Sequence, residues 1–156
     1  MDDENILIAV ALVRRHGPSG TKWLGKLNPA TNTIRFPIGF ADSKETLRDS
    51  VIETVAWELG INPKRDILVS RMAQLNFEFA NSVPAVVDQK PFIASFYNVE
   101  IYGRSPRESI GCDPQVRWLS SEEIWTGKSR DGELLDPLIF QMVTRTQVIR
   151  QWESTA

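Results

Sequence analysis

The segment Lys44–Leu59 constrains the fold more than any other part of the chain, because its apolar residues recur at helical spacing. The repeating positions are Leu47, Val51, Val55 and Leu59. Residues four apart lie on one face of an α-helix, so this stripe predicts an amphipathic helix that packs against a core. Gly60 follows where many helices end on a left-handed residue, and Pro63 lies shortly beyond it.

Apolar segments on both sides of this helix predict a β-sheet. Ile6–Arg14 is a continuous, β-branched run, as expected for a central strand that is covered on both faces. Further extended segments are expected at Lys22–Leu27, Thr33–Pro37, Ile67–Ala80, Phe92–Gly103 and Val116–Leu119. Asn81–Pro91 and Arg104–Pro114 are rich in residues that break regular structure, and we expect both to be loops.

Two further helix starts complete the expected architecture. Ser120 or Ser121, followed by Glu122 and Glu123, predicts a capped helix, and Asp136 with Pro137 predicts the start of a C-terminal helix. This order of elements predicts an α/β fold in which helices sandwich a mixed β-sheet. A chain of 156 residues fits a single domain over residues 1–156.

Composition argues against several classes of protein. A net charge of −2 gives no global positive field that would attract nucleic acid or an anionic membrane. Cys112 is the only cysteine and His16 the only histidine, so neither an internal disulfide nor a cysteine metal cluster is possible. The acidic start of the chain lacks the features of a signal peptide, and no apolar run is long enough for a membrane helix. We therefore expect a cytoplasmic protein.

The segment from Gly39 to Ile61 resembles the catalytic motif of the Nudix hydrolases. That motif has a Gly, five residues, a Glu, seven residues, and then Arg-Glu-(apolar)-x-Glu-Glu-x-Gly-(apolar). The positions that match are Gly39, Glu45, Val55, Glu58, Gly60 and Ile61. The resemblance implies a Nudix-like α/β/α sandwich with a mixed β-sheet, and it implies metal-dependent hydrolysis of a nucleoside diphosphate linked to another group.

Three positions depart from the motif in ways that bear on chemistry. Glu53 stands where the family has Arg, Thr54 stands where it has Glu, and Trp57 replaces the first Glu of the later pair. Residues 54, 57 and 58 are three and four apart and share a helix face. Mg²⁺ needs several hard oxygen ligands, whereas this face offers a hydroxyl, an indole and one carboxylate. We therefore expect most of the metal-binding capacity to be lost.

A surviving metal site would have to use other acidic residues. The candidate catalytic groups are Glu58, Glu53 and Glu45, with Glu58 and Glu53 as ligands of Mg²⁺ or Mn²⁺ if the protein is active. Glu78, Glu100, Glu108 and Asp113 are further candidates from later segments. The candidate substrate-binding residues are Gly39, Trp57 and Arg14, which would allow close approach of phosphate, stack on a base and pair with phosphate, respectively.

Three functions remain open from the sequence. The first is binding of a nucleotide or another phosphate-containing ligand with little or no hydrolysis. The second is metal-dependent pyrophosphohydrolysis of nucleoside diphosphate derivatives at a remodelled site. The third is a protein-interaction module with a vestigial pocket. The oligomeric state is also open, a homodimer included, and a fold does not fix a function.

Overall fold

A computed structural model describes residues 6–79 and 92–151 of the chain. Its elements are β1 (Ile6–Gly17), β2 (Gly20–Asn28), β3 (Thr33–Arg35), β4 (Ile38–Ala41), the 3₁₀ turn η1 (Lys44–Thr46), α1 (Leu47–Leu59), β5 (Ile67–Val69), β6 (Leu75–Phe79), β7 (Phe92–Ile101), α2 (Arg104–Gly111), β8 (Val116–Leu119), α3 (Ser121–Thr126), β9 (Leu134–Leu135) and α4 (Pro137–Thr146). No helix in these two ranges is both long and apolar enough to cross a membrane.

Strand β1 organises the sheet because it pairs with three other strands. It runs parallel to β7 from Ile6↔Phe92 to Val13↔Val99 and antiparallel to β4 over Leu7–Val10. Beyond residue 13 it pairs with β2 instead, starting at Arg14↔Trp23. The described strands form a mixed sheet in the order β5-β7-β1-β2-β3-β9, with β4, β6 and β8 attached to β1, β7 and β2.

The core has two parts, one on each side of β1. Ile8, Val10 and Leu12 belong to the cluster that includes residues of α3 and α4. Leu7, Ala9, Ala11 and Val13 belong to the cluster that includes α1 and Ile110 of α2. Alternate residues of a strand point to opposite faces, which explains why this run is apolar throughout. The predicted central strand and the α/β sandwich with a mixed sheet are confirmed.

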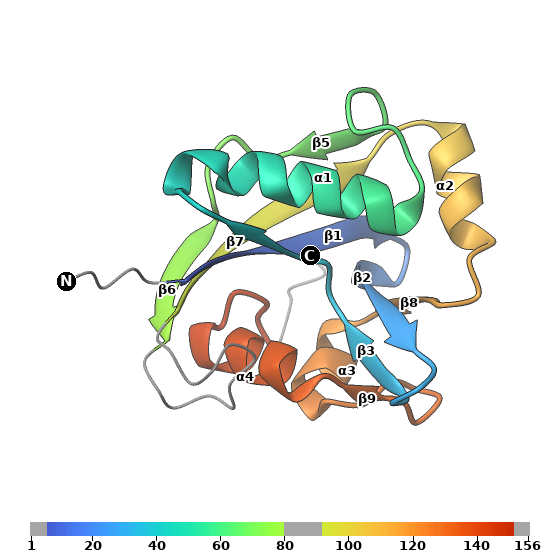
Figure 1. The fold of residues 1–156 in the computed structure, drawn as a ribbon. Coiled ribbons are helices and arrows are strands. Elements are labelled where there is room, and N and C mark those ends of the chain that lie inside the picture. Colours follow the sequence, from blue (N-terminus) through green and yellow to red (C-terminus); the bar gives the residue numbers. More distant parts are fainter. Residues whose placement is uncertain (1–5, 80–91, 152–156) are drawn as a thin grey trace.

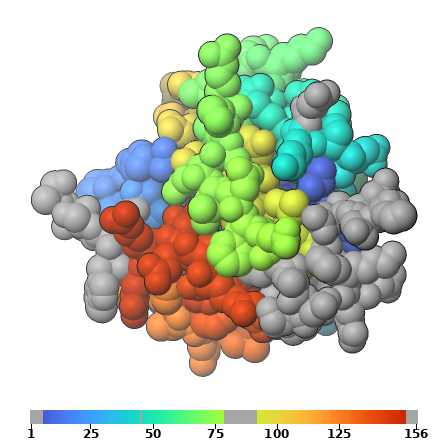
Figure 2. Space-filling view, turned by 90° about the vertical axis from the view of Figure 1, so that its left-hand side faces the viewer, coloured from blue at the N-terminus to red at the C-terminus, as the bar shows by residue number. Residues whose placement is uncertain are grey.

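The helices cover both faces of the sheet (Figure 1): α1 lies on one side and α3 and α4 lie on the other, with α2 beside the end of α1. Figure 2 shows the edge of the molecule where the green segment that includes β6 lies between α1, in cyan, and α4, in red. Arg48 ties α1 to β5 through two hydrogen bonds, to the carbonyl oxygens of Ser70 and Val69, both at 3.1 Å.

Most of the helix ends agree with the sequence expectations. Gly60 is left-handed at the end of α1, with φ of 67°. Ser120 and Glu123 form a reciprocal capping box at the start of α3, and Asp136 caps α4 ahead of Pro137. The expected loop at Arg104–Pro114 is wrong, because residues 104–111 form α2. The expected loop Asn81–Pro91 lies outside the described residues.

Candidate functional site

Helix α1 carries the residues at the divergent motif positions. Trp57 is 84% exposed, and Thr54 and Glu58 are partly buried beside it. A tryptophan with this exposure makes little contribution to the core, so its indole is free to contact a ligand. Val55 and Leu59, on the opposite face, are buried in the core and hold the helix in place.

Lys26 of β2 reaches the carboxyl end of this helix. Its Nζ donates a hydrogen bond of 2.8 Å to the backbone carbonyl of Glu58, and it lies 3.4 Å from Asp113 Oδ2. The carbonyl groups in the last turn of a helix carry partial negative charge, so an ammonium group is favourable there. Only 22% of the Lys26 side chain is exposed, which reduces the screening of this charge by solvent.

Glu58 is placed among positive charges. Burial raises the pKa of its carboxyl group above the ordinary value, and the charges of Arg35 and Lys26 offset part of that rise. Lys26 and Arg35 are direct partners across the β2–β3 ladder, which explains why both lie near Glu58. Glu58 therefore lies next to two cations, of which Lys26 is held in place by its hydrogen bond to the end of α1.

These groups line a groove that we call the helix-end groove. It has a volume of about 550 Å³ and is lined by Lys26, Leu27, Asn28, Pro29, Thr31, Thr33, Arg35, Trp57, Glu58, Gln115 and Asp136. This size lies within the usual range for small-molecule sites. Two cations and an exposed indole at one groove provide the contacts that a phosphate attached to a planar base would need.

Gly39 is buried between β4 and α1. It pairs with Ala9 in the sheet, and an added Cβ would collide with Ser50 Oγ and lie 2.9 Å from Thr54 Oγ1. Ser50 also donates a hydrogen bond of 2.9 Å to the carbonyl of Phe40. The space that a side chain would need at Gly39 is therefore filled by α1, and the glycine permits close packing of this helix on β4. Its predicted contact with phosphate stays a prediction.

The other candidate carboxylates are spread over the surface. Glu53 and Glu78 are exposed, Glu108 forms an exposed ion pair with Arg104, and Glu100 pairs with Arg14. Asp113 is the member of this group that lies close to the groove, through its contact with Lys26. The side chain of Glu45 lies outside what the structure describes. Its backbone belongs to η1, ahead of α1.

The residues at this site do not fit the magnesium centre that the motif resemblance implies. Within residues 6–79 and 92–151, no three Asp, Glu, His or Cys side chains are grouped so that they could hold a metal ion. The ammonium group of Lys26 stands between Asp113 and the end of α1, next to Glu58. A divalent cation would be repelled by this charge and by Arg35, and Trp57 supplies no oxygen ligand.

Arg14 lies in a different place from the other candidate binding residues. It lines a second cavity of about 360 Å³ together with Glu100, Arg107 and Trp118, and this cavity shares no lining residue with the helix-end groove. The structure therefore groups Trp57 with Glu58 and separates both from Arg14.

Sequence reasoning overlooked the two cations of the groove. The register of the β2–β3 hairpin, in which Asn28 faces Thr33, places Lys26 opposite Arg35. Asn28–Asn32 separates the expected extended segments Lys22–Leu27 and Thr33–Pro37, and counting outward from it places residue 26 opposite residue 35. That register was the available signal, because partners across an antiparallel pair lie within about 5.5 Å of each other.

Comparisons with solved structures identify proteins of similar fold. The Ap4A hydrolase of C. elegans matches with a TM-score of 0.58 at 12% identity, over 79% of this chain and 86% of that one. NrtR of Shewanella oneidensis matches with a TM-score of 0.62 at 18% identity, over 94% of this chain. This chain spans 61% of that longer one.

A third structure is the NUDIX domain of the same NrtR, in complex with ADP ribose. It matches with a TM-score of 0.57 at 14% identity, over 94% of this chain and 88% of that domain. No family model matches the chain, and neither does any curated protein sequence. At these identities the similarity shows the fold.

Proposed function

We propose that this protein, which has the Nudix fold, binds a nucleotide or another phosphate-containing ligand in the helix-end groove with little or no hydrolysis. One observation carries the proposal. Where the motif resemblance implies metal-binding carboxylates, the groove has the exposed indole of Trp57 and the two cations Lys26 and Arg35 beside Glu58.

The proposed contacts follow from the chemistry of these side chains. Arg35 and the remaining donors of Lys26 would pair with phosphate oxygens by charge-assisted hydrogen bonds. Trp57 would stack on the base or on another planar group of the ligand. In this arrangement Lys26 and Arg35 supply positive charge to the phosphate, so we expect binding without a divalent metal ion.

The leading alternative is a pyrophosphohydrolase with a remodelled metal site. It would use Mg²⁺ or Mn²⁺ held by Glu58 and Glu53, with Glu45 as a further catalytic group, and Gly39 would admit phosphate. The preserved motif spacing favours this alternative, whereas the cations around Glu58 count against it. The protein-interaction module is the second alternative.

The test is isothermal titration calorimetry with ADP and ADP-ribose, each in the presence of Mg²⁺ and of chelator. ADP-ribose is chosen because it is bound by the NUDIX domain of similar fold. We expect binding that is retained in chelator, and release of no product from either compound. Trp57→Ala should weaken binding by about two- to tenfold, the equivalent of a stacking contact worth about 0.5–1.5 kcal/mol. Arg35→Gln should weaken it by about three- to tenfold, allowing for solvent screening.

Arg104→Gln is the matched control for charge, because Arg104 is exposed on α2 and does not line the groove. We expect it to bind both compounds as the unaltered protein does. Metal-dependent product release that disappears in Glu58→Gln would establish the remodelled-site alternative and refute our proposal. Absence of binding to both compounds, together with a mass that depends on protein concentration, would favour the interaction module.

A further inference from the structure

The second cavity lies where the two parallel central strands separate. The β1–β7 ladder ends at Val13↔Val99, after which β1 continues beside β2 and β7 leads through Gly103 into α2. Ligands of α/β proteins often bind in a crevice at the carboxyl ends of the parallel strands, at the point where neighbouring strands lead to opposite sides of the sheet. We call this space of about 360 Å³ the strand-split cavity.

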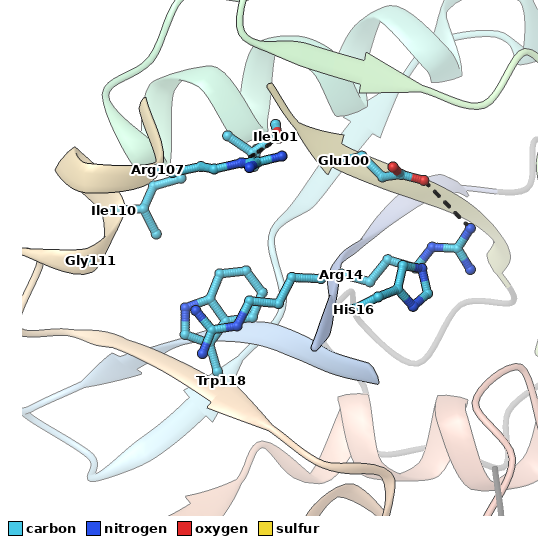
Figure 3. A pocket seen from close by; sticks show the side chains of 9 residues that line it. Arg14, His16, Glu100, Ile101, Arg107, Ile110, Gly111 and Trp118 are labelled. Atoms are coloured by element: carbon cyan, nitrogen blue, oxygen red, sulfur yellow. Dashed lines mark hydrogen bonds and ion pairs between the residues drawn. The ribbon is translucent and has the colours of Figure 1, made fainter. Parts of the chain in front are cut away.

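Arginines from two elements surround this cavity (Figure 3). Arg14 and Arg15 come from β1 and Arg107 comes from α2, and Glu100 is the only acidic residue among those that line the cavity. Glu100 lies 3.8 Å from Arg14 and is nearly half exposed. That distance is longer than a charge-assisted hydrogen bond, and an exposed pair of this kind contributes little, so the positive charge is incompletely neutralised.

The guanidinium groups are positioned but retain unused hydrogen-bond donors. Arg15 stacks over the ring of Trp118 at 4.3 Å from its centroid, and Arg107 Nε donates to the carbonyl of Ile101 at 3.3 Å. Among the described residues, the terminal nitrogens of Arg15 and Arg107 have no hydrogen-bond partner. Arg14 Nε is buried and also lacks a hydrogen-bond partner within the described part of the chain. Guanidinium groups held in fixed planes with free donors suit a phosphate group.

The remaining walls limit what else the cavity accepts. Ile101, Ile110 and the ring of Trp118 give it an apolar lining beside the arginines. Its volume lies at the lower end of the range for small-molecule sites, which favours a compact molecule over a dinucleotide. The lining residues differ throughout from those of the helix-end groove.

We propose that the strand-split cavity is a second binding site, specific for a small phosphate monoester, and that it is independent of the helix-end groove. The phosphate would be held by the guanidinium groups of Arg15 and Arg107, and the organic part would lie against Trp118 and Ile110. Inorganic phosphate shares the anionic group but lacks the organic part, so it would bind more weakly.

The experiment is an NMR titration of the ¹⁵N-labelled protein with ribose 5-phosphate, inorganic phosphate and ribose. The indole signal of Trp118 is assigned with Trp118→Phe. We expect ribose 5-phosphate to shift this signal with saturation, inorganic phosphate to do so at higher concentration, and ribose to leave it unchanged. Arg107→Gln should weaken binding of ribose 5-phosphate by about fivefold or more, because it removes a charge-assisted contact.

Arg104→Gln is again the matched control, since it removes the same charge from an exposed position of the same helix. We expect it to change the affinity for ribose 5-phosphate by less than about twofold, because distant exposed charges are screened. Arg107 is exposed, so its substitution should leave the fold intact, and the dispersion of the NMR spectrum checks this directly.

Three outcomes would overturn the inference: no saturable shift of Trp118 with ribose 5-phosphate, equal losses in Arg107→Gln and Arg104→Gln, or loss of binding in Lys26→Met. The last result would place the phosphate in the helix-end groove. Failure of nucleotide binding in that groove would leave the present test unaffected, because the probes are different and because Trp118 and Arg107 line the strand-split cavity alone.

Discussion

Replacing Gly39 tests how closely α1 packs against β4. In Gly39→Ala the new Cβ would collide with Ser50 Oγ, and would lie 2.9 Å from Thr54 Oγ1 and 3.0 Å from the Ser50 carbonyl. Strand β4 is fixed by its ladder with β1, and α1 is fixed by its buried stripe, so neither element can move freely. Overpacking of this kind costs about 1–3 kcal/mol, and we expect a loss within that range in the free energy of unfolding.

The assay is urea denaturation followed by circular dichroism, for Gly39→Ala, Ser50→Ala and the double variant. Ser50→Ala removes the oxygen that suffers the worst contact, so the cost of Gly39→Ala should fall by about 1 kcal/mol in that background. Gly111→Ala is the matched control, because a Cβ there meets no atom within 4 Å, and it should leave stability unchanged or slightly raised. An equal cost of Gly39→Ala in both backgrounds, or no cost at all, would refute the packing argument.

Two further predictions concern carboxyl groups with opposite pKa shifts. The pKa of Glu58 is raised because burial disfavours its charged form. Its contribution to folding stability is therefore greatest below the pKa of the unfolded chain, near 4.5, and is lost as the pH rises through the folded value. Glu58→Gln should therefore gain stability relative to the unaltered protein at pH 7, with the gain shrinking towards pH 4 in urea titrations. The pKa of Glu133 is lowered by its paired hydrogen bonds to Arg117, at 2.8 and 2.9 Å, so its contribution is present above the unfolded value and is lost as the pH falls. Glu133→Gln should lose about 1–3 kcal/mol at pH 7 and less at pH 3, and an equal loss at both values would contradict this.

The parts of the fold that were predictable from sequence are those specified by local patterns. The helix with its stripe at Leu47 and Val51, the doubly covered strand β1 and the cap at Ser120 each depend on residues within a few positions of one another. Helix α2 contains Pro106, a residue type that usually breaks regular structure, so the sequence alone favours a loop there. Pro106 lies in the first turn, where the backbone N–H of a helix has no partner, and proline is tolerated there.

The two cavities depend on long-range pairing that local patterns do not encode. The strand-split cavity exists because β1 and β7, far apart in the chain, run parallel as far as residue 13 and then diverge. The helix-end groove requires β2 to bring Lys26 to the last turn of α1, 32 residues away in sequence. The motif resemblance identified Trp57 and Glu58, and helical spacing placed them on one face, but neither could associate them with cations from a separate hairpin.

The proposed replacement of metal by side-chain cations has different consequences for binding and for catalysis. A phosphate chain needs neutralisation in its ground state, and cations such as Lys26 and Arg35 would contribute to it without recruiting an ion. Hydrolysis also needs an activated water. A bound metal activates water by coordinating it and lowering its pKa, whereas an ammonium or guanidinium group does not coordinate water. In the proposed function, the same two residues would therefore favour retention of the ligand and loss of turnover. Because Lys26 also stabilises the end of α1 through the Glu58 carbonyl, removing it would weaken the helix terminus before it restored any metal site.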